Sequence, residues 1–260
     1  MSGPHTGRQL AALVVDDLGK PGCGAWCGRV NWKASGMTTL PNTPPGGGAV
    51  LKVVHRKGSG TSAHPHTDAN GISIASRHPA IAGQQAVVVS FDLYFDPNRW
   101  HWSRGGKLGG LFVGEGKASG GRHVADGASH RIMFQADGGA ISYCYFPAGV
   151  PQPNIKVKGH AMGEGYHHEL FKNVFKPGTW HRVQIGLKNN SFVNGQPAAD
   201  GAAMLSIDGK TGMLRGVNWS ATPGTTLESF ELSSFFGGPD PAVVDSVYYA
   251  RNFAVHEWKE

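Results

Sequence analysis

The feature that most constrains the fold is a succession of short runs of β-branched and aromatic residues, each closed by turn-forming residues. AVVVSFDLYF (Ala86–Phe95), ended by Asp-Pro-Asn, is the clearest of these runs. No segment shows sustained 3.6-residue periodicity, and the 39 glycines and 16 prolines suit many short strands better than helices. We therefore predict an all-β antiparallel sandwich, with strands at residues 49–55, 72–76, 86–95, 129–135, 140–146, 180–188, 203–207, 227–236 and 245–255.

The strands are expected to form a single domain. No repeat of fixed period is visible, and no linker divides the runs into two sets. The first 45 residues are rich in glycine and proline and end in the breaker cluster LPNTPPGGG. We expect residues 1–45 to form an N-terminal wrap with little regular structure, and residues 46–260 to form the sandwich.

The charge of the chain favours a polyanionic partner. The formal net charge is +6 without any block of five or six basic residues, so nucleic acid, anionic lipid and acidic polysaccharide all remain open. The apolar run LAALVV is short and is followed by Asp16 and Asp17, which is not typical of a signal peptide. No segment is long enough to span a bilayer. We expect a chain that is cytosolic, delivered by another vehicle, or recorded without its leader.

Neither the cysteines nor the histidines form a metal-binding pattern. Cys23 and Cys27 are compatible with a bridge or with two free thiols, and there is no second pair for a zinc ribbon. The clusters at residues 64–68 (HPHTD) and 166–169 (YHHE) match no tight zinc template, so both are expected in surface loops, although His167 or His168 could border a binding site. We expect no metal and no cofactor.

A predicted hairpin, ASHRIMFQADGGAISYCYFP, carries the clearest functional pattern. Ser129, Arg131, Met133 and Gln135 alternate with the mostly apolar set His130, Ile132 and Phe134, and two tyrosines alternate with Cys144 and Phe146. Pairing across the Asp-Gly-Gly turn predicts one solvent-facing surface, formed by Ser129, Arg131, Tyr143 and Tyr145. These residues suit an acidic sugar, but on the pattern alone an ordinary solvated face is the favoured interpretation.

Upstream, glycines flank Lys107 in RGGKLGGL. The missing side chains would let a ligand approach a lysine in a glycine-lined groove, whereas the alternative is a flexible surface loop. A phosphate-binding loop is a poor explanation, because no helix pattern follows and no Gly-Lys-Ser/Thr is present. Trp100 and Trp102 are candidates for stacking on sugar rings, but tryptophans of this kind are at least as often core.

Taken in order, RGGKLGGL, SGG, the SHR…YCY hairpin, FKPGTWHRVQIGL and SSFFGGPDP resemble polysaccharide lyase family 14 over roughly residues 86–255. The resemblance implies a β-jelly-roll sandwich with a cleft across its concave sheet. It also implies alginate or glucuronan lyase activity and a catalytic set, and we add a substrate-binding set. The catalytic set is Lys107, Ser129, Arg131, Tyr143 and Tyr145; the substrate-binding set is Gly106, Trp102, Gln135 and His168.

Two features depart from the family pattern. Where relatives often have Lys-Leu-Pro-Gly, this chain has Lys107-Leu108-Gly109-Gly110, which suggests a looser loop. The first 80 residues match nothing that we can place, so we expect them to carry a specificity feature or a separate role.

The residue types fit a lyase that removes the C5 proton of a uronate and expels the C4 oxygen, leaving a 4,5-unsaturated end. Arg131 and Lys107 would neutralise the carboxylate, and the tyrosines would share the proton transfers unless Lys107 is itself the base. A non-catalytic carbohydrate-binding sandwich and a basic nucleic-acid binder are the competing hypotheses. We expect a monomer whose partner is an acidic extracellular or cell-wall polysaccharide, reached by secretion or virus delivery, and neither nucleic acid nor membrane.

Overall fold

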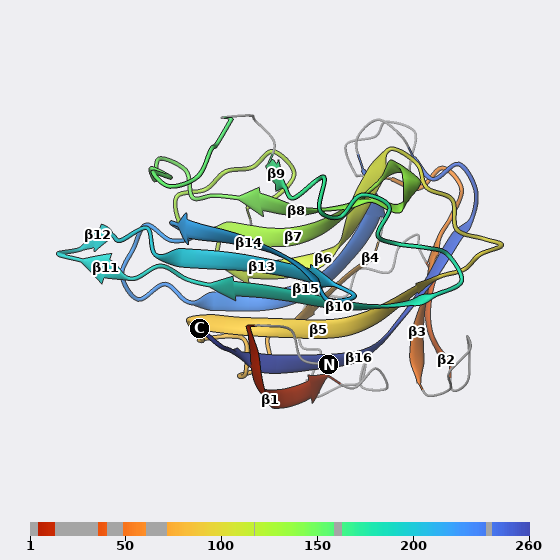
Figure 1. Cartoon of the computed structure of the whole chain (residues 1–260), viewed down its shortest axis with the longest axis horizontal. Coiled ribbons are helices and arrows are strands. Elements are labelled where there is room, and N and C mark those ends of the chain that lie inside the picture. The colour runs from red at the N-terminus through yellow and green to blue at the C-terminus, as the bar shows by residue number, and fades with distance from the viewer. Residues whose placement is uncertain are drawn as a thin grey trace.

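The protein is described here from a computed structural model, which describes residues 5–13, 36–40, 49–60, 72–116, 118–158, 163–237 and 241–260 (Figure 1). Within these ranges the regular structure is strand, apart from a single 3₁₀ turn, η2 (Ala136–Gly138). All strand pairs are antiparallel, and the strands form two large sheets and one small hairpin. The prediction of an all-β antiparallel sandwich is confirmed. None of the described residues forms a helix that is long and apolar enough to cross a membrane.

The larger sheet has eight strands, in the order β14-β13-β10-β5-β16-β3-β2, and β1 pairs with β16 beside this path. Its members are β1 (Thr6–Leu13), β2 (Gly36–Leu40), β3 (Val50–His55), β5 (Ala86–Phe95), β10 (Trp180–Lys188), β13 (Gly201–Ile207), β14 (Lys210–Val217) and β16 (Ser246–Trp258).

The second sheet has six strands, in the order β4-β15-β6-β7-β8-β9. Its members are β4 (Ile72–Ser76), β15 (Leu227–Phe236), β6 (Gly105–Val113), β7 (Ala128–Gln135), β8 (Ala140–Tyr145) and β9 (Glu164–Tyr166). The hairpin β11 (Phe192–Val193) and β12 (Gln196–Pro197) projects from one end of the molecule (Figure 1, left).

The core fills the space between the two sheets. Alternate residues of β5, from Val87 to Phe95, face alternate residues of the six-stranded sheet such as Ile132, Phe134 and Phe230, and all of them are buried. We call the side of the six-stranded sheet that faces this core its inner face, and the opposite side its outer face. Ile141, Tyr143 and Tyr145 form a separate cluster on the outer face with Met133 packed against them.

The N-terminal segment is more regular than we expected. Thr6–Leu13 and Gly36–Leu40 are both strands of the larger sheet, so the expectation of little regular structure in residues 1–45 was wrong for these two stretches. β1 pairs with the C-terminal strand from Thr6↔Trp258 to Leu13↔Phe253. The physical reason is tertiary: TGRQLAAL has no strict polar–apolar alternation of its own, and β16 supplies an edge on which its backbone hydrogen bonds can form.

The glycine-rich segment around Lys107 is also a strand rather than a loop. All nine residues of β6 are buried, and β6 lies between β15 and β7. A Cβ on Gly106 would lie 2.3 Å from Cζ of Phe134, so the glycine leaves room for that ring. Glycine has low strand propensity, which is why the composition of this stretch concealed a central strand.

Two histidines are buried between the sheets. Burial lowers the pKa of His55 to about 3 and that of His130 to about 3, so both are neutral in the folded protein. His130 Nδ1 donates to the Gly186 carbonyl oxygen at 3.1 Å, which links β7 to β10 of the other sheet.

These histidines predict acid sensitivity. Below about pH 6.5 these two histidines bind protons in the unfolded chain but stay neutral in the folded protein. The free energy of unfolding should therefore fall as pH drops from 6.5 towards 3. Each histidine should contribute about 1.4 kcal/mol per pH unit. Denaturant titrations at pH 7, 6 and 5 measure this slope. His130→Gln keeps a donor for Gly186 and should show a shallower slope; an unchanged slope would contradict the assignment.

Candidate functional site

The hairpin of β7 and β8 brings the predicted residues together. Its register pairs Ser129 with Tyr145 and Arg131 with Tyr143, and paired residues of an antiparallel sheet share a face. All four side chains therefore lie on the outer face, while Ile132, Phe134 and Cys144 face the core. The predicted alternation of this hairpin is confirmed.

The expectation of a solvent-facing surface was wrong. Ser129 and Tyr145 are 0% exposed, Arg131 2%, Lys107 6% and Tyr143 9%. The backbone at Ala118 and Gly121, which the sequence pattern did not place here, contacts two of them. The Gly121 N–H donates to Tyr145 Oη at 3.0 Å, and Ser129 Oγ donates to the Ala118 carbonyl oxygen at 2.7 Å.

Lys107 joins this group because of a β-bulge in β6. Lys107 pairs with Met133, Gly109 with Ile132 and Gly110 with Arg131, so Leu108 is one extra residue on β6 relative to β7. In a regular strand, residues three positions apart point to opposite faces. Because Gly110 pairs with Arg131 on the outer face, Lys107 would then face the core. The bulge instead puts Leu108 into the core and Lys107 onto the outer face with Met133.

Gly109 has the backbone conformation that this bulge requires. Its φ is +142°, which a proline cannot adopt, since the proline ring fixes φ near −65°. A Cβ here would lie 2.8 Å from the Glu231 carbonyl oxygen. Glycine in place of the expected proline does not give the looser loop we expected, because Gly109 pairs with Ile132 of β7 and the next residue, Gly110, pairs with Glu231 of β15.

The Lys107 ammonium lies among three aromatic rings. Nζ is 4.8 Å from the ring centroid of Tyr143, 5.2 Å from that of Phe235 and 5.9 Å from that of Tyr145. Burial, together with the nearby charge of Arg131, lowers the pKa of Lys107 to about 7. At neutral pH a large fraction of Lys107 is therefore an uncharged amine, which can accept a proton.

Arg131 is held between β7 and β15. Its Nη2 donates to Ser233 Oγ at 2.9 Å, and its guanidinium carbon lies 5.7 Å and 5.6 Å from the ring centroids of Phe112 and Phe235. Burial lowers the pKa of Arg131 to about 10, an effect that the charge of Glu231 opposes. Arg131 is thus a fixed cation in a largely dry site, suited to binding a carboxylate.

The two phenols are in contact and differ in exposure. The ring centroids of Tyr143 and Tyr145 are 5.6 Å apart, and the two rings meet edge to face at 77°. Burial, together with the neighbouring Tyr145, raises the pKa of Tyr143 above its ordinary value, so Tyr143 keeps its proton. Tyr143 is also the more accessible of the two.

The sequence reasoning gave no role to three residues of β15 that belong to this group. Glu231, Ser233 and Phe235 alternate with Leu232 and Phe236, which face the core. Their spacing of two residues in the sequence ESFELSSFF is the signal that could have placed them on the outer face.

Two of the predicted substrate-binding residues do not join the site. Gly106 pairs with Phe134 on the inner face, where its missing side chain accommodates that ring. Trp102 packs against Phe95, Phe134 and Phe175 and so belongs with the core. Both placements correct the prediction, because the tight core beneath β6 requires a glycine at the first position and an aromatic filler at the second.

The other two stay compatible with a substrate contact. Gln135 lies half-buried at the end of β7, on the same face as Arg131. His168 is exposed, and its Nε2 would be 3.0 Å from a Cβ on Gly165, which pairs with Tyr143. His167 differs: it contacts Ser142 Oγ and the Met213 carbonyl oxygen, and so connects the two sheets.

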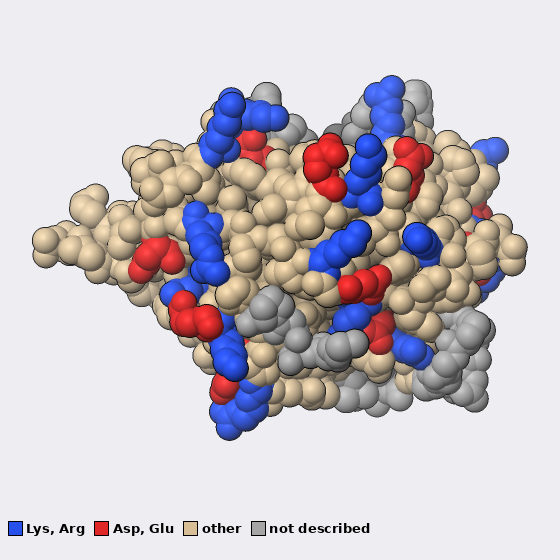
Figure 2. Space-filling model, viewed as in Figure 1, with Lys and Arg blue, Asp and Glu red and all other residues tan. Residues whose placement is uncertain are grey.

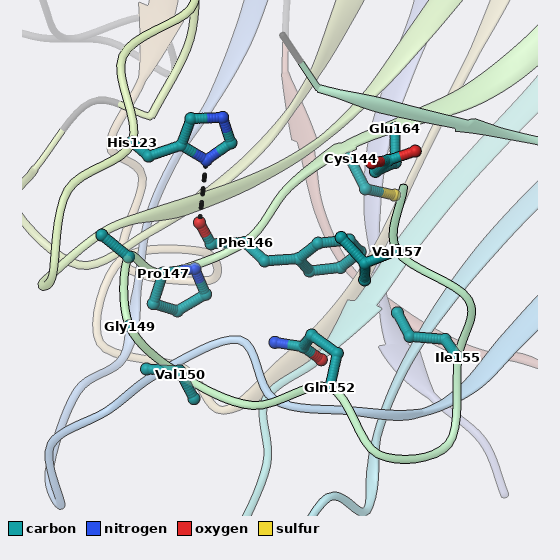
Figure 3. Close-up of a pocket in the computed structure, with 11 residues that line it drawn as sticks. His123, Cys144, Phe146, Pro147, Gly149, Val150, Gln152, Ile155, Val157 and Glu164 are labelled. Atoms are coloured by element: carbon teal, nitrogen blue, oxygen red, sulfur yellow. Dashed lines mark hydrogen bonds between the residues drawn. The ribbon is translucent and has the colours of Figure 1, made fainter. Parts of the chain in front are cut away.

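A cavity of about 430 Å³ lies on the side of β8 opposite to Tyr143 and Tyr145 (Figure 3). Cys144, Phe146 and Glu164 line it together with the chain from Pro147 to Val157, and His123 stands at one side. Because Cys144 and Phe146 lie on the inner side of β8, this cavity is separate from the tyrosine pair. The buried Cys144 thiol is free, and burial raises its pKa, so it is unreactive.

The described residues contain no cluster of metal ligands, and the face drawn in Figure 2 shows no basic patch. Among the described residues, no three His, Cys, Asp or Glu side chains converge as metal ligands. The HPHTD cluster and the pair Cys23 and Cys27 lie outside the described residues. On the face drawn in Figure 2, Lys and Arg are interspersed with Asp and Glu and do not gather into one basic patch.

Comparison with known proteins points to one enzyme family. The family model described as "Polysaccharide lyase 14" matches residues 43–253. The alginate lyase vAL-1 from Chlorella virus is 36% identical and superposes with a TM-score of 0.85, covering 96% of this chain and 100% of its own.

Two more distant structures share the fold. They are the alginate lyase of the same family from Aplysia kurodai (24% identity, TM-score 0.68, 84% of this chain and 86% of its own), and the endo-β-1,4-glucuronan lyase from the fungus Trichoderma reesei (13%, 0.61, 96% and 96%). No curated protein sequence matches the chain.

The bulge predicts that adding a single methyl group at Gly109 lowers the free energy of unfolding by an unusually large amount. Gly109→Ala combines a disfavoured φ with a contact of 2.8 Å to the Glu231 carbonyl oxygen, so we expect a loss of about 2–4 kcal/mol in the free energy of unfolding. Gly149→Ala is the matched control, because its φ is +75° but nothing lies within 4 Å of the added Cβ. Denaturant unfolding compares the two; equal losses would contradict a packed bulge.

Proposed function

The chain belongs to polysaccharide lyase family 14, and on that premise we propose that it cleaves a uronate polysaccharide of the alginate or glucuronan type by β-elimination. The observation that carries the proposal is the convergence of Lys107, Arg131 and Tyr143 on the outer face of the six-stranded sheet. These residues supply a base, a fixed cation and a proton donor, which are the three groups that the reaction needs.

The first step requires an acidified C5 proton. Arg131 binds the uronate carboxylate, and its charge stabilises the enolate-like anion that develops when the proton leaves. Since the guanidinium is anchored to Ser233 and stacked between two phenylalanine rings, it is preorganised for this role. Arg131 therefore favours the transition state more than the ground state.

We propose a role for each of the residues whose part in the reaction the sequence left open. Uncharged Lys107 takes the C5 proton, because its pKa of about 7 makes the free amine available at neutral pH. The C5–H electron pair forms the C4–C5 double bond and the C4–O bond breaks. Tyr143, which is protonated in the free enzyme, donates its proton to the departing oxygen. The proton that Lys107 took from C5 then passes to the phenolate, directly or through solvent, which restores the amine and the phenol before the next turnover. Tyr145 and Ser129 are fully buried and hold this arrangement.

The arrangement also bears on the choice of substrate. Lys107 and Tyr143 reach the sugar from the same sheet face, so the proton and the oxygen should leave from one face of the ring. In mannuronate and glucuronate the C5 hydrogen and the C4 oxygen lie on the same face, whereas in guluronate they lie on opposite faces. We therefore propose that polymannuronate and glucuronan are better substrates than polyguluronate.

An assay of acidic polysaccharides tests the function. Polymannuronate, glucuronan and polyguluronate are incubated with the protein while the near-ultraviolet absorbance of unsaturated uronate ends is recorded. We expect absorbance to rise fastest on the first two substrates and to be lost in Lys107→Met. Absence of any signal would overturn the lyase, and binding without cleavage would indicate a carbohydrate-binding module. Faster cleavage of polyguluronate would overturn the same-face assignment alone.

The tyrosine pair separates proton transfer from positioning. Tyr143→Phe should keep substrate binding but lower kcat about 10²–10⁴-fold, the usual contribution of a general acid. Tyr145→Phe should cost only about tenfold, because this phenol acts through Tyr143. Steady-state kinetics on the preferred polymer measures both. A larger loss in Tyr145→Phe than in Tyr143→Phe would reverse the assignment.

A further inference from the structure

Glu231 is an acidic residue in a site that must bind a polyanion. It is 4% exposed and lies on the outer face of β15. An uncompensated carboxylate here would repel the carboxylates of the substrate and would be costly to bury. Its presence therefore calls for a specific role.

The register of three strands shows what Glu231 faces. Glu231 pairs with Gly110 of β6, and Gly110 pairs with Arg131 of β7, so the three residues form one row across the sheet. Gly110 has no side chain, and a Cβ there would lie 2.8 Å from Cγ of Arg131 and 2.2 Å from the His130 carbonyl oxygen. The glycine thus leaves open the space through which Glu231 and Arg131 interact.

The electrostatics agree with this geometry. Burial works against the charge of Arg131, and Glu231 is the largest of the groups that support it. Breaking such a buried pair from one side leaves an uncompensated charge, which is strongly destabilising.

We propose that Glu231 is the positioning residue of this site: across Gly110, its carboxylate holds the Arg131 guanidinium in place before a substrate carboxylate arrives. The catalytic role of Glu231 rests on the proposed function, whereas its pairing with Arg131 does not depend on that function. Glu231 also compensates the charge of Arg131, and it is this charge of Arg131 that, after burial, lowers the pKa of Lys107. Without Glu231, the ammonium form of Lys107 should be less favourable.

A double-mutant cycle tests the pairing without any activity measurement. We expect Glu231→Gln and Arg131→Met each to lower the unfolding temperature, and the double variant to lower it by clearly less than the sum. Additive losses would overturn the pairing. If Glu231→Gln alone does not fold, a folded double variant supports the proposal, and an unfolded one overturns it.

The pH profile then tests the effect on the reaction. In the wild type, kcat/KM should rise with pH through about 7 as Lys107 loses its proton. In Glu231→Gln this limb should move to lower pH by roughly half a unit or more, while Glu231→Asp, which keeps the charge, should leave it in place but lower kcat/KM. The control is Glu228→Gln on the same strand, whose ion pair with Arg77 involves an exposed arginine.

The outcomes separate the two proposals. An active wild type whose limb does not move in Glu231→Gln overturns the role of Glu231 and leaves the lyase intact. An inactive wild type overturns the proposed function, and the double-mutant cycle still decides the pairing.

Discussion

Lys107 reaches the outer face of the six-stranded sheet because β6 carries one residue more than β7 between the pairs Lys107↔Met133 and Gly110↔Arg131. The extra residue, Leu108, turns into the core, and Gly109 takes a φ of +142° to let it do so. The amine consequently lies beside the two tyrosines of β8. The bulge therefore decides whether Lys107 can react with a ligand, because a lysine on the inner face would be shut off from any ligand.

Burial gives the site its electrostatic properties. Burial extends from Tyr145 and Ser129 to Lys107 and Arg131, and it affects these two basic groups differently. The lysine pKa falls to about 7, near the working range of a base, whereas the arginine pKa falls only to about 10, so Arg131 stays a cation. One dry environment thus produces both a proton acceptor and a fixed positive charge.

Much of this arrangement follows from two-residue periodicity. Ser129 and Arg131 alternate with core residues, as do Tyr143 and Tyr145, so their shared face could be predicted. Lys107 could not be placed in the same way, because in GGKLGGLFV it has the parity of Leu111, a core residue, and only pairing with β7 reveals the bulge. Burial was missed for a related reason: hydrogen bonds from Gly121 and to Ala118 are tertiary contacts that local pattern does not encode.

The central claim is that the pKa of Lys107 is lowered to about 7, so that a large fraction of the free enzyme carries an uncharged amine at neutral pH. Nuclear magnetic resonance of protein labelled with ¹³C at lysine Cε measures this directly, with Lys107→Met used to assign the signal. A titration midpoint near 7 is the result the account predicts. A midpoint near 10.4, that of an ordinary lysine, would contradict it.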